Sequence, residues 1–205
     1  MLIGTLRFRD AAARCRRLVL TVRCFAALAL PDSAREALAR ATKPFQSRNW
    51  PVRWVQVEGA HVTLKFYGEV NEDRVDAIAE SLNFAVEGIG PLPLMLTGFG
   101  ALPRPEKART FIATVEAPPA LELVQDRIET RAEALDHPGE GTIFHPHVTI
   151  GRVREGQRVP QAEAAELFAA TLQTGFTADR VVLFRSVLAP GGAQYTPIHQ
   201  AKLAG

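Results

Sequence analysis

The 205-residue chain is poor in cysteine and has no long hydrophobic run. Its only two cysteines, Cys15 and Cys24, form no Cys-x-x-Cys pair, which argues against a disulfide framework and suits a reducing cytosol. No apolar stretch approaches the roughly 20 residues that a membrane span needs, and none resembles a signal sequence followed by a cleavage site. These absences predict a cytoplasmic protein with no membrane partner.

An excess of charge of one sign is also missing. The 24 lysines and arginines are set against 22 acidic residues, which leaves a net charge of +2. A protein that grips long duplexes mainly through their phosphates has a much stronger basic bias. The length fits one enzyme domain with a substantial core.

Histidine is scarce too, yet two of the five histidines begin the same four-residue pattern. The copies are His61-Val62-Thr63-Leu64 and His147-Val148-Thr149-Ile150. Two such matches among five histidines arise by chance about once in a thousand trials. The duplication therefore indicates function, whereas a single His-x-Thr is more often a solvated or hydrogen-bonded pair.

Both copies are expected to lie on β-strands. Because successive side chains of a strand point to opposite faces, His61 and Thr63 share one face, as do His147 and Thr149. The aliphatic residues between them would anchor each strand to a core. Two such strands side by side would place two imidazoles and two hydroxyls around one cleft.

The segment His145-Pro146-His147 raises the possibility of a metal site, since imidazoles are common zinc ligands. A zinc site needs three or four ligands, and neither a cysteine nor a His-Glu-x-x-His helix lies nearby. We therefore predict no metal and no cofactor. His137 and His199 have no motif around them and are interpreted as surface or strand-end residues.

Hydrophobic periodicity and turn residues predict alternating strands and helices. Strands are expected at about 18–30, 52–57, 92–97, 110–115, 180–188 and 194–203, in addition to the two motif strands. Helices are expected at 34–45, at about 75–86 with Asn71 as a cap, at 121–135 and at 161–172. Turns are expected at 98–100 and around 190–192. Strands flanked by helices in two comparable halves predict an α+β protein with two pseudo-symmetric lobes.

The paired motifs are accompanied by other segments that carry a family resemblance. These are Arg23 to Pro31, Phe99-Gly100, Phe144 to Arg152, and Pro190-Gly191-Gly192-x-x-Tyr195. Together they resemble the 2H phosphoesterase superfamily, specifically the RNA 2′,3′-cyclic phosphodiesterases once described as 2′-5′ RNA ligases. The resemblance covers about Val22 to the C-terminus.

This resemblance implies a bilobal fold of antiparallel-rich sheet and flanking helices with a central groove. It implies hydrolysis of a 2′,3′-cyclic phosphate to a 2′-phosphomonoester without a metal. The expected partners are RNA with a 2′,3′-cyclic phosphate end or a small cyclic nucleotide, and the expected state is a monomer. Since family members usually begin near Val22, the arginine-rich segment 1–21 is expected to be a disordered extension or a start-site artefact, and 22–205 to be the domain.

The paired motifs suit this chemistry. Opening a cyclic phosphate requires one group to take a proton from water and another to give a proton to the departing oxygen. Imidazoles can do both near neutral pH. We predict that His61 protonates the leaving 3′ oxygen and His147 activates water, and the sequence leaves the reverse assignment open. Thr63 and Thr149 are expected to donate hydrogen bonds to the non-bridging oxygens, where charge builds up.

Five further residues are candidates for supporting roles. Arg152 lies where the family often has an arginine near the phosphate, but strict alternation places it on the face opposite His147, and a surface arginine is an equal alternative. Lys65 is expected to be a solvated charge at the groove's edge. Phe66, Tyr67 and Tyr195 could stack on a base, although Phe66 is expected to belong to the core.

Two alternatives to the phosphodiesterase remain. The chain could be an RNA-end or nucleotide-binding module with little turnover, or it could have 2′-5′ RNA ligase activity. The presence of all four motif residues favours the enzyme, because a pure binder has no need of two proton-transfer groups.

Overall fold

The computed structural model describes residues 20–139, 141–189 and 192–205. The expected extension 1–21 therefore lies almost entirely outside the described residues, as do Pro190 and Gly191 of the expected turn. No helix among the described residues is long and apolar enough to cross a membrane.

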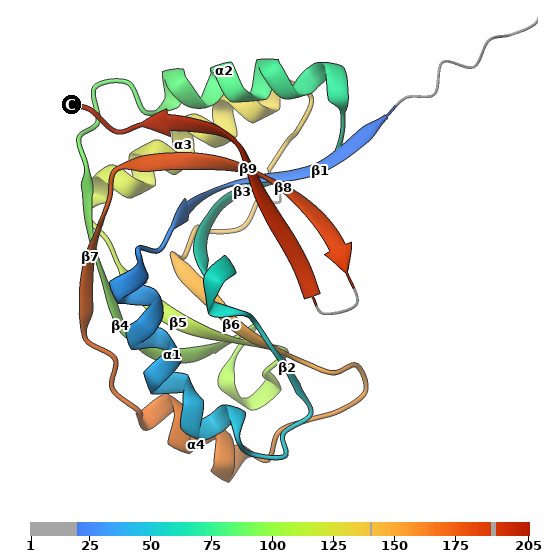
Figure 1. The fold of residues 1–205 in the computed structure, drawn as a ribbon, viewed down its shortest axis with the longest axis vertical. Coiled ribbons are helices and arrows are strands. Elements are labelled where there is room, and N and C mark those ends of the chain that lie inside the picture. Colours follow the sequence, from blue (N-terminus) through green and yellow to red (C-terminus); the bar gives the residue numbers. More distant parts are fainter. Residues whose placement is uncertain (1–19, 140, 190–191) are drawn as a thin grey trace, which may run out of the picture.

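One curled sheet of nine strands forms the centre of the molecule (Figure 1). The strands are β1 (Thr21–Ala29), β2 (Val52–Trp54), β3 (His61–Asn71), β4 (Leu92–Leu102), β5 (Thr110–Glu116), β6 (His147–Val153), β7 (Thr174–Ala178), β8 (Arg180–Ala189) and β9 (Gly192–Lys202). Their order is β7-β4-β5-β6-β3-β1-β8-β9, with β2 paired to β6. All these pairings are antiparallel.

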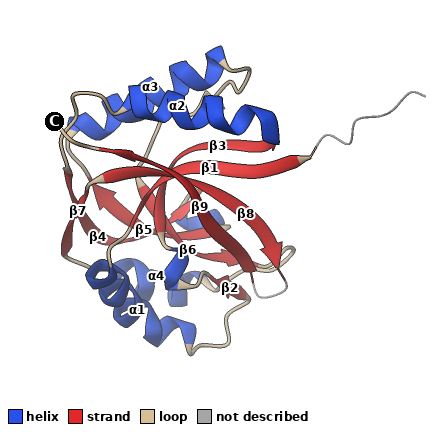
Figure 2. Cartoon of the chain, turned by 45° about the horizontal axis from the view of Figure 1, so that its top comes forward, coloured by secondary structure: helices blue, strands red, loops and turns tan. Residues whose placement is uncertain are grey.

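The helices divide this sheet into two lobes, as Figure 2 shows. They are α1 (Asp32–Gln46), α2 (Val75–Ala85), α3 (Pro119–Ala134) and α4 (Gln161–Ala169). Helices α2 and α3 pack together and cover β3-β1-β8-β9, whereas α1 and α4 cover β6-β5-β4-β7. The α+β fold with two similar lobes is confirmed.

The helices that follow β1 and β5 each cross to the other lobe. Helix α1 comes between β1 and β3 in sequence but packs toward β7, and α3 comes between β5 and β6 but packs on β3. Each buries an apolar stripe at helical spacing, for example Leu38 and Phe45 of α1 and Val124 and Ile128 of α3. Each of these helices therefore connects two strands of one lobe while it packs on the other lobe.

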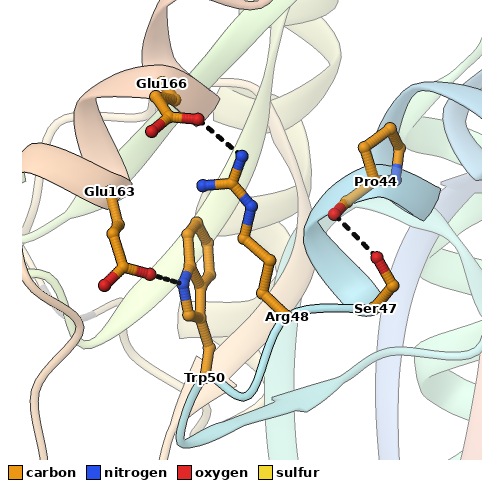
Figure 3. A network of polar contacts seen from close by, with 6 residues as sticks. All are labelled: Pro44, Ser47, Arg48, Trp50, Glu163 and Glu166. Atoms are coloured by element: carbon orange, nitrogen blue, oxygen red, sulfur yellow. Dashed lines mark hydrogen bonds and ion pairs between the residues drawn. The ribbon is translucent and has the colours of Figure 1, made fainter.

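The loop after α1 is tied to α4 by two side chains (Figure 3). Arg48 Nη2 donates to Glu166 Oε2 at 2.5 Å, and Trp50 Nε1 donates to Glu163 Oε2 at 2.5 Å. Trp50 is buried and stacks with Trp54 of β2 at a centroid distance of 6.1 Å. These contacts fix the path of the chain into β2, beside β6.

The sequence-based boundaries fail in a few places. The predicted turn at 98–100 is wrong, because these residues continue β4 after an irregularity near Thr97 and pair with β5. The short strand β7 was not predicted, β2 ends at Trp54, and α4 ends at Ala169. A 3-10 helix (Glu72–Arg74) separates Asn71 from α2, and Asn71 makes no side-chain capping bond.

Candidate active site

The two motif strands are neighbours at the centre of the sheet, where Val62 of β3 pairs with Val148 of β6. Because the strands are antiparallel, this register places His61 beside Thr149 and Thr63 beside His147. Val62 and Val148 are fully buried, whereas the histidines and threonines are half-buried. We call the face that carries His61, Thr63, His147 and Thr149 the site face.

The fourth residue of each motif forms a β-bulge. On β3, Thr63 and Lys65 pair with adjacent residues of β1, so Leu64 is the extra residue. On β6, Thr149 and Gly151 pair with adjacent residues of β5, so Ile150 is the extra residue. A bulge shifts the alternation by one residue, and the residues that follow it exchange faces.

On β3 this exchange reverses two expectations. Lys65 is not a solvated charge at the groove's edge: its residue is 5% exposed, and Nζ donates to Glu129 Oε2 of α3 at 2.6 Å and to the Pro138 carbonyl at 3.1 Å. Phe66 is not core: it is 53% exposed, and its ring lies 5.4 Å from that of Phe25.

On β6 the same exchange brings Arg152 to the site face. Gly151 takes the core side, where a Cβ would approach Val52 Cγ1 to 2.7 Å and so could not be accommodated without movement. The exposed guanidinium of Arg152 reaches Thr110 Oγ1 of β5 at 3.4 Å. Strict alternation would place Arg152 on the opposite face, and the bulge at Ile150 brings it to the site face.

Backbone carbonyls orient both imidazoles in the same way. His61 Nδ1 lies 2.6 Å from the Gly59 carbonyl oxygen, and His147 Nδ1 lies 2.8 Å from that of His145. A carbonyl can only accept a hydrogen bond, so Nδ1 carries a proton in both rings. This arrangement leaves Nε2 of each ring as the nitrogen that can exchange a proton with a bound molecule.

Aromatic rings pack around His61. The centroid of Phe25 lies 4.7 Å from that of the imidazole, and the ring of Tyr195 stands perpendicular to it at 5.2 Å. Gly59 permits this approach, because a Cβ there would lie 3.1 Å from Tyr195 Cδ2. Tyr195 therefore supports His61, while Tyr67 is buried on the other face against His137, at 5.6 Å.

Burial lowers the pKa of His61 below the ordinary histidine value. The positive charges of Arg152 and His147 lower this pKa further, while the hydrogen bond to Gly59 acts in the opposite direction. In the absence of a bound anion, the neutral form of His61 is favoured.

This electrostatic coupling gives a measurable prediction. Replacing Arg152 with glutamine removes a nearby positive charge, so the pKa of His61 should rise toward the ordinary value. The titration of the His61 ring protons by NMR would measure the change. As a control, Arg40→Gln removes an exposed charge on α1 and should leave the His61 pKa unchanged. An unshifted His61 titration in Arg152→Gln would contradict the coupling.

The remaining histidines do not belong to the motif pair. His199 Nε2 is 2.9 Å from Asn83 Oδ1 of α2, and His145 contributes its carbonyl to His147. Across 20–139, 141–189 and 192–205, no group of three or more His, Cys, Asp or Glu side chains is placed to hold a metal ion. Cys24 is buried, and burial raises its pKa to about 11.

Sequence reasoning missed Phe25 and Phe184 beside His61, and Arg53, which pairs with Arg152 in the register between β2 and β6. Phe25 and Phe184 lie within apolar strands and offered no distinguishing signal, yet both rings lie near His61. Arg53 alternates with two apolar neighbours in Val52-Arg53-Trp54, and this pattern could have placed it on the open face.

The chain is similar to known proteins in sequence and in fold. A family model described as the 2′-5′ RNA ligase superfamily matches residues 30–188. A protein of Methanothermobacter thermautotrophicus named RNA 2′,3′-cyclic phosphodiesterase is 28% identical over 187 residues, which cover 90% of this chain and all of the relative. A protein of Thermotoga maritima with the same name is 26% identical over 186 residues, 90% of this chain and 97% of the relative.

Solved structures show the same fold. TT0787 of Thermus thermophilus superposes with a TM-score of 0.76 at 25% identity, covering 89% of this chain and 98% of TT0787. Escherichia coli LigT complexed with 3′-AMP superposes with a TM-score of 0.73 at 21% identity, covering 91% of this chain and all of LigT.

Proposed function

The chain belongs to the 2′-5′ RNA ligase superfamily, and on that premise we propose that it is an RNA 2′,3′-cyclic phosphodiesterase that forms 2′-phosphomonoester ends. The observation that carries the proposal is the matched pair of imidazoles. His61 and His147 lie on adjacent strands, each with Nδ1 held by a backbone carbonyl and Nε2 left to act. The names of the relatives support the same reaction class.

The proposed reaction is an in-line displacement at phosphorus between the two histidines. One neutral imidazole takes a proton from water as the water oxygen bonds to phosphorus, and the other, protonated, gives its proton to the 3′ oxygen as the P–O3′ bond breaks. Thr63 and Thr149 donate hydrogen bonds to the non-bridging oxygens, and Arg152 balances their charge. Protein side chains supply every proton transfer, so the reaction needs no metal.

The division of roles can be tested with the leaving group. The sequence-based assignment makes His61 the acid, whereas its lowered pKa favours the neutral form that a base needs before the anionic substrate binds. An aryl phosphodiester has a leaving group that departs without a proton. His61 and His147 are each replaced in turn. The variant that hydrolyses the aryl substrate but not the cyclic phosphate has lost the general acid, and the variant that hydrolyses neither has lost the base.

The function itself is tested with an oligonucleotide that ends in a 2′,3′-cyclic phosphate, incubated with the protein in EDTA. We expect the cyclic end to open to a 2′-phosphate, with no 3′-phosphate, as resolved by chromatography against both standards. Loss of activity in EDTA that a divalent metal restores would overturn the two-histidine mechanism. Binding without any opening would support the nucleotide-binding alternative.

The threonines should affect rate without affecting proton transfer. Thr63→Val and Thr149→Val keep the shape of the side chain but remove the donor, so each should cost about 1 to 4 kcal/mol in transition-state binding. The pH–rate profile should keep its flanks while its height falls. Thr177→Val, at an exposed position of β7, is the control. Unchanged rates would mean that the motif threonines serve only the neighbouring strands.

A further inference from the structure

Strand β2 places a second arginine beside Arg152. In the register between β2 and β6, Arg53 pairs with Arg152, and directly paired residues lie on the same face with Cβ atoms about 4.5 to 5.5 Å apart. Val52 and Trp54 approach Gly151 on the core side, so the exposed Arg53 belongs to the site face. The site face thus continues beyond the motifs with two guanidinium groups.

This pairing of like charges is unfavourable by itself. Within the described part of the chain, neither Arg53 nor Arg152 lies within ion-pair distance of a carboxylate, in contrast to Arg35, Arg48 and Arg180. The polar side-chain contact of this pair is the one from Arg152 to Thr110. Two unopposed guanidinium groups side by side form a site whose charge an anion would balance, and guanidinium matches the geometry of a phosphate group.

The arginines extend the row of motif residues. Along the β3–β6 boundary, Thr63 lies beside His147 and His61 beside Thr149, and where β3 gives way to β2 along β6, Arg53 lies beside Arg152. Arg152 follows Thr149 by three residues that include one bulge, so the two positions are roughly 7 to 10 Å apart along the strand. A long arginine side chain bridges much of this separation.

We propose that Arg53 and Arg152 form a second phosphate subsite, which binds the phosphodiester on the 5′ side of the terminal nucleotide. This inference rests on the proposed function, in which the cyclic phosphate lies between the histidines. Arg152 serves both phosphates, because it follows Thr149 on the site face of β6, whereas Arg53 serves the second one. The subsite makes the protein selective for the ends of RNA strands over nucleoside 2′,3′-cyclic monophosphates, which have no second phosphate.

The test compares two dinucleotides with a 2′,3′-cyclic end, one joined by a phosphodiester and one by an uncharged methylphosphonate. They present the same bases and differ in the charge that Arg53 is proposed to bind. We expect the wild-type protein to have about tenfold or higher kcat/KM for the charged dinucleotide, and Arg53→Gln to lose most of this preference. Arg53→Lys should retain part of it, and Arg40→Gln, on the outer face of α1, should retain all of it.

Salt dependence adds a second readout that a purely structural role would not change. For the charged dinucleotide, the slope of log kcat/KM against log salt concentration should be shallower by about 0.7 in Arg53→Gln, as for the loss of one single-strand phosphate contact. Equal preference in wild type and Arg53→Gln, or a wild type with no preference, would overturn the subsite.

Failure of the proposed function has a different signature, because neither dinucleotide would then be hydrolysed. In that case, binding of the two dinucleotides to wild type and Arg53→Gln, followed by fluorescence anisotropy, still tests the subsite. A wild-type preference for the charged linkage that Arg53→Gln lacks supports it, and identical binding of the two linkages contradicts it.

Discussion

Replacing His61 or His147 with asparagine should lower turnover of a 2′,3′-cyclic phosphate by roughly 10² to 10⁴, the range for loss of a general acid or base. Asparagine is the sharper choice than alanine, because its amide can still donate to the Gly59 or His145 carbonyl that now holds each Nδ1. The strand geometry is then retained while proton transfer is lost. Single-turnover rates at several pH values would measure the loss.

The double variant tests whether the two rings act together. Residues that act as a unit are not additive, so the double substitution should cost less than the product of the single losses. His199→Asn is the matched control, because this histidine lies away from the site face against Asn83. Turnover close to normal in either single variant would remove that histidine from the proposed mechanism.

Removing Glu129 should destabilise the fold by about 3 to 5 kcal/mol, because Glu129→Leu leaves the ammonium of Lys65 buried without its counter-ion. The Lys65 side chain is 4% exposed, whereas that of Glu129 is 30% exposed. Lys65→Met should therefore cost less, since the carboxylate left behind can still be hydrated. Free energies of unfolding in urea would give both values.

The double variant, with Lys65→Met and Glu129→Leu, should recover most of the lost stability, because apolar residues often replace a buried ion pair at little cost. Equal losses of stability in the two single variants would show that the exposure of the two charged groups does not determine the free energy of unfolding that is lost. Arg40→Gln, which breaks an exposed ion pair on α1, should change stability by at most about 1 kcal/mol.

The elements around the motifs could be predicted, and the bulges could not. Strict alternation through His61-Val62-Thr63-Leu64 is correct as far as Leu64, and the buried Val62, Leu64 and Val148 confirm it. Beyond that point, hydrophobicity favours Lys65 outside and Phe66 inside, and the structure has the opposite. A single extra residue in one strand has no signature in one sequence, because its cause lies in the register with a neighbouring strand.

The turn predicted at the glycines of β4 was wrong for a related reason. Gly98 and Gly100 are turn residues by composition, but here they pair with Thr114 and Ile112 of β5. Strand β7 was missed because Thr174 to Ala178 is short and mixed in character, and its pairing with β4 supplies what local propensity does not. In both cases a distant strand decides the local conformation.

The crossing of α1 and α3 has a consequence for how the molecule can be divided. A cut between α2 and β4 would give one fragment with β1 and β3 but without β8 and β9. The other fragment would have β8 and β9 but lack β1 and β3. Neither fragment contains a whole lobe, and each retains a helix whose packing surface belongs to the other. The two His-x-Thr segments are encoded in separate halves, so they become neighbours only when the halves fold as one cooperative unit. A hinge that opened the molecule between the two segments would have to unpack both crossing helices.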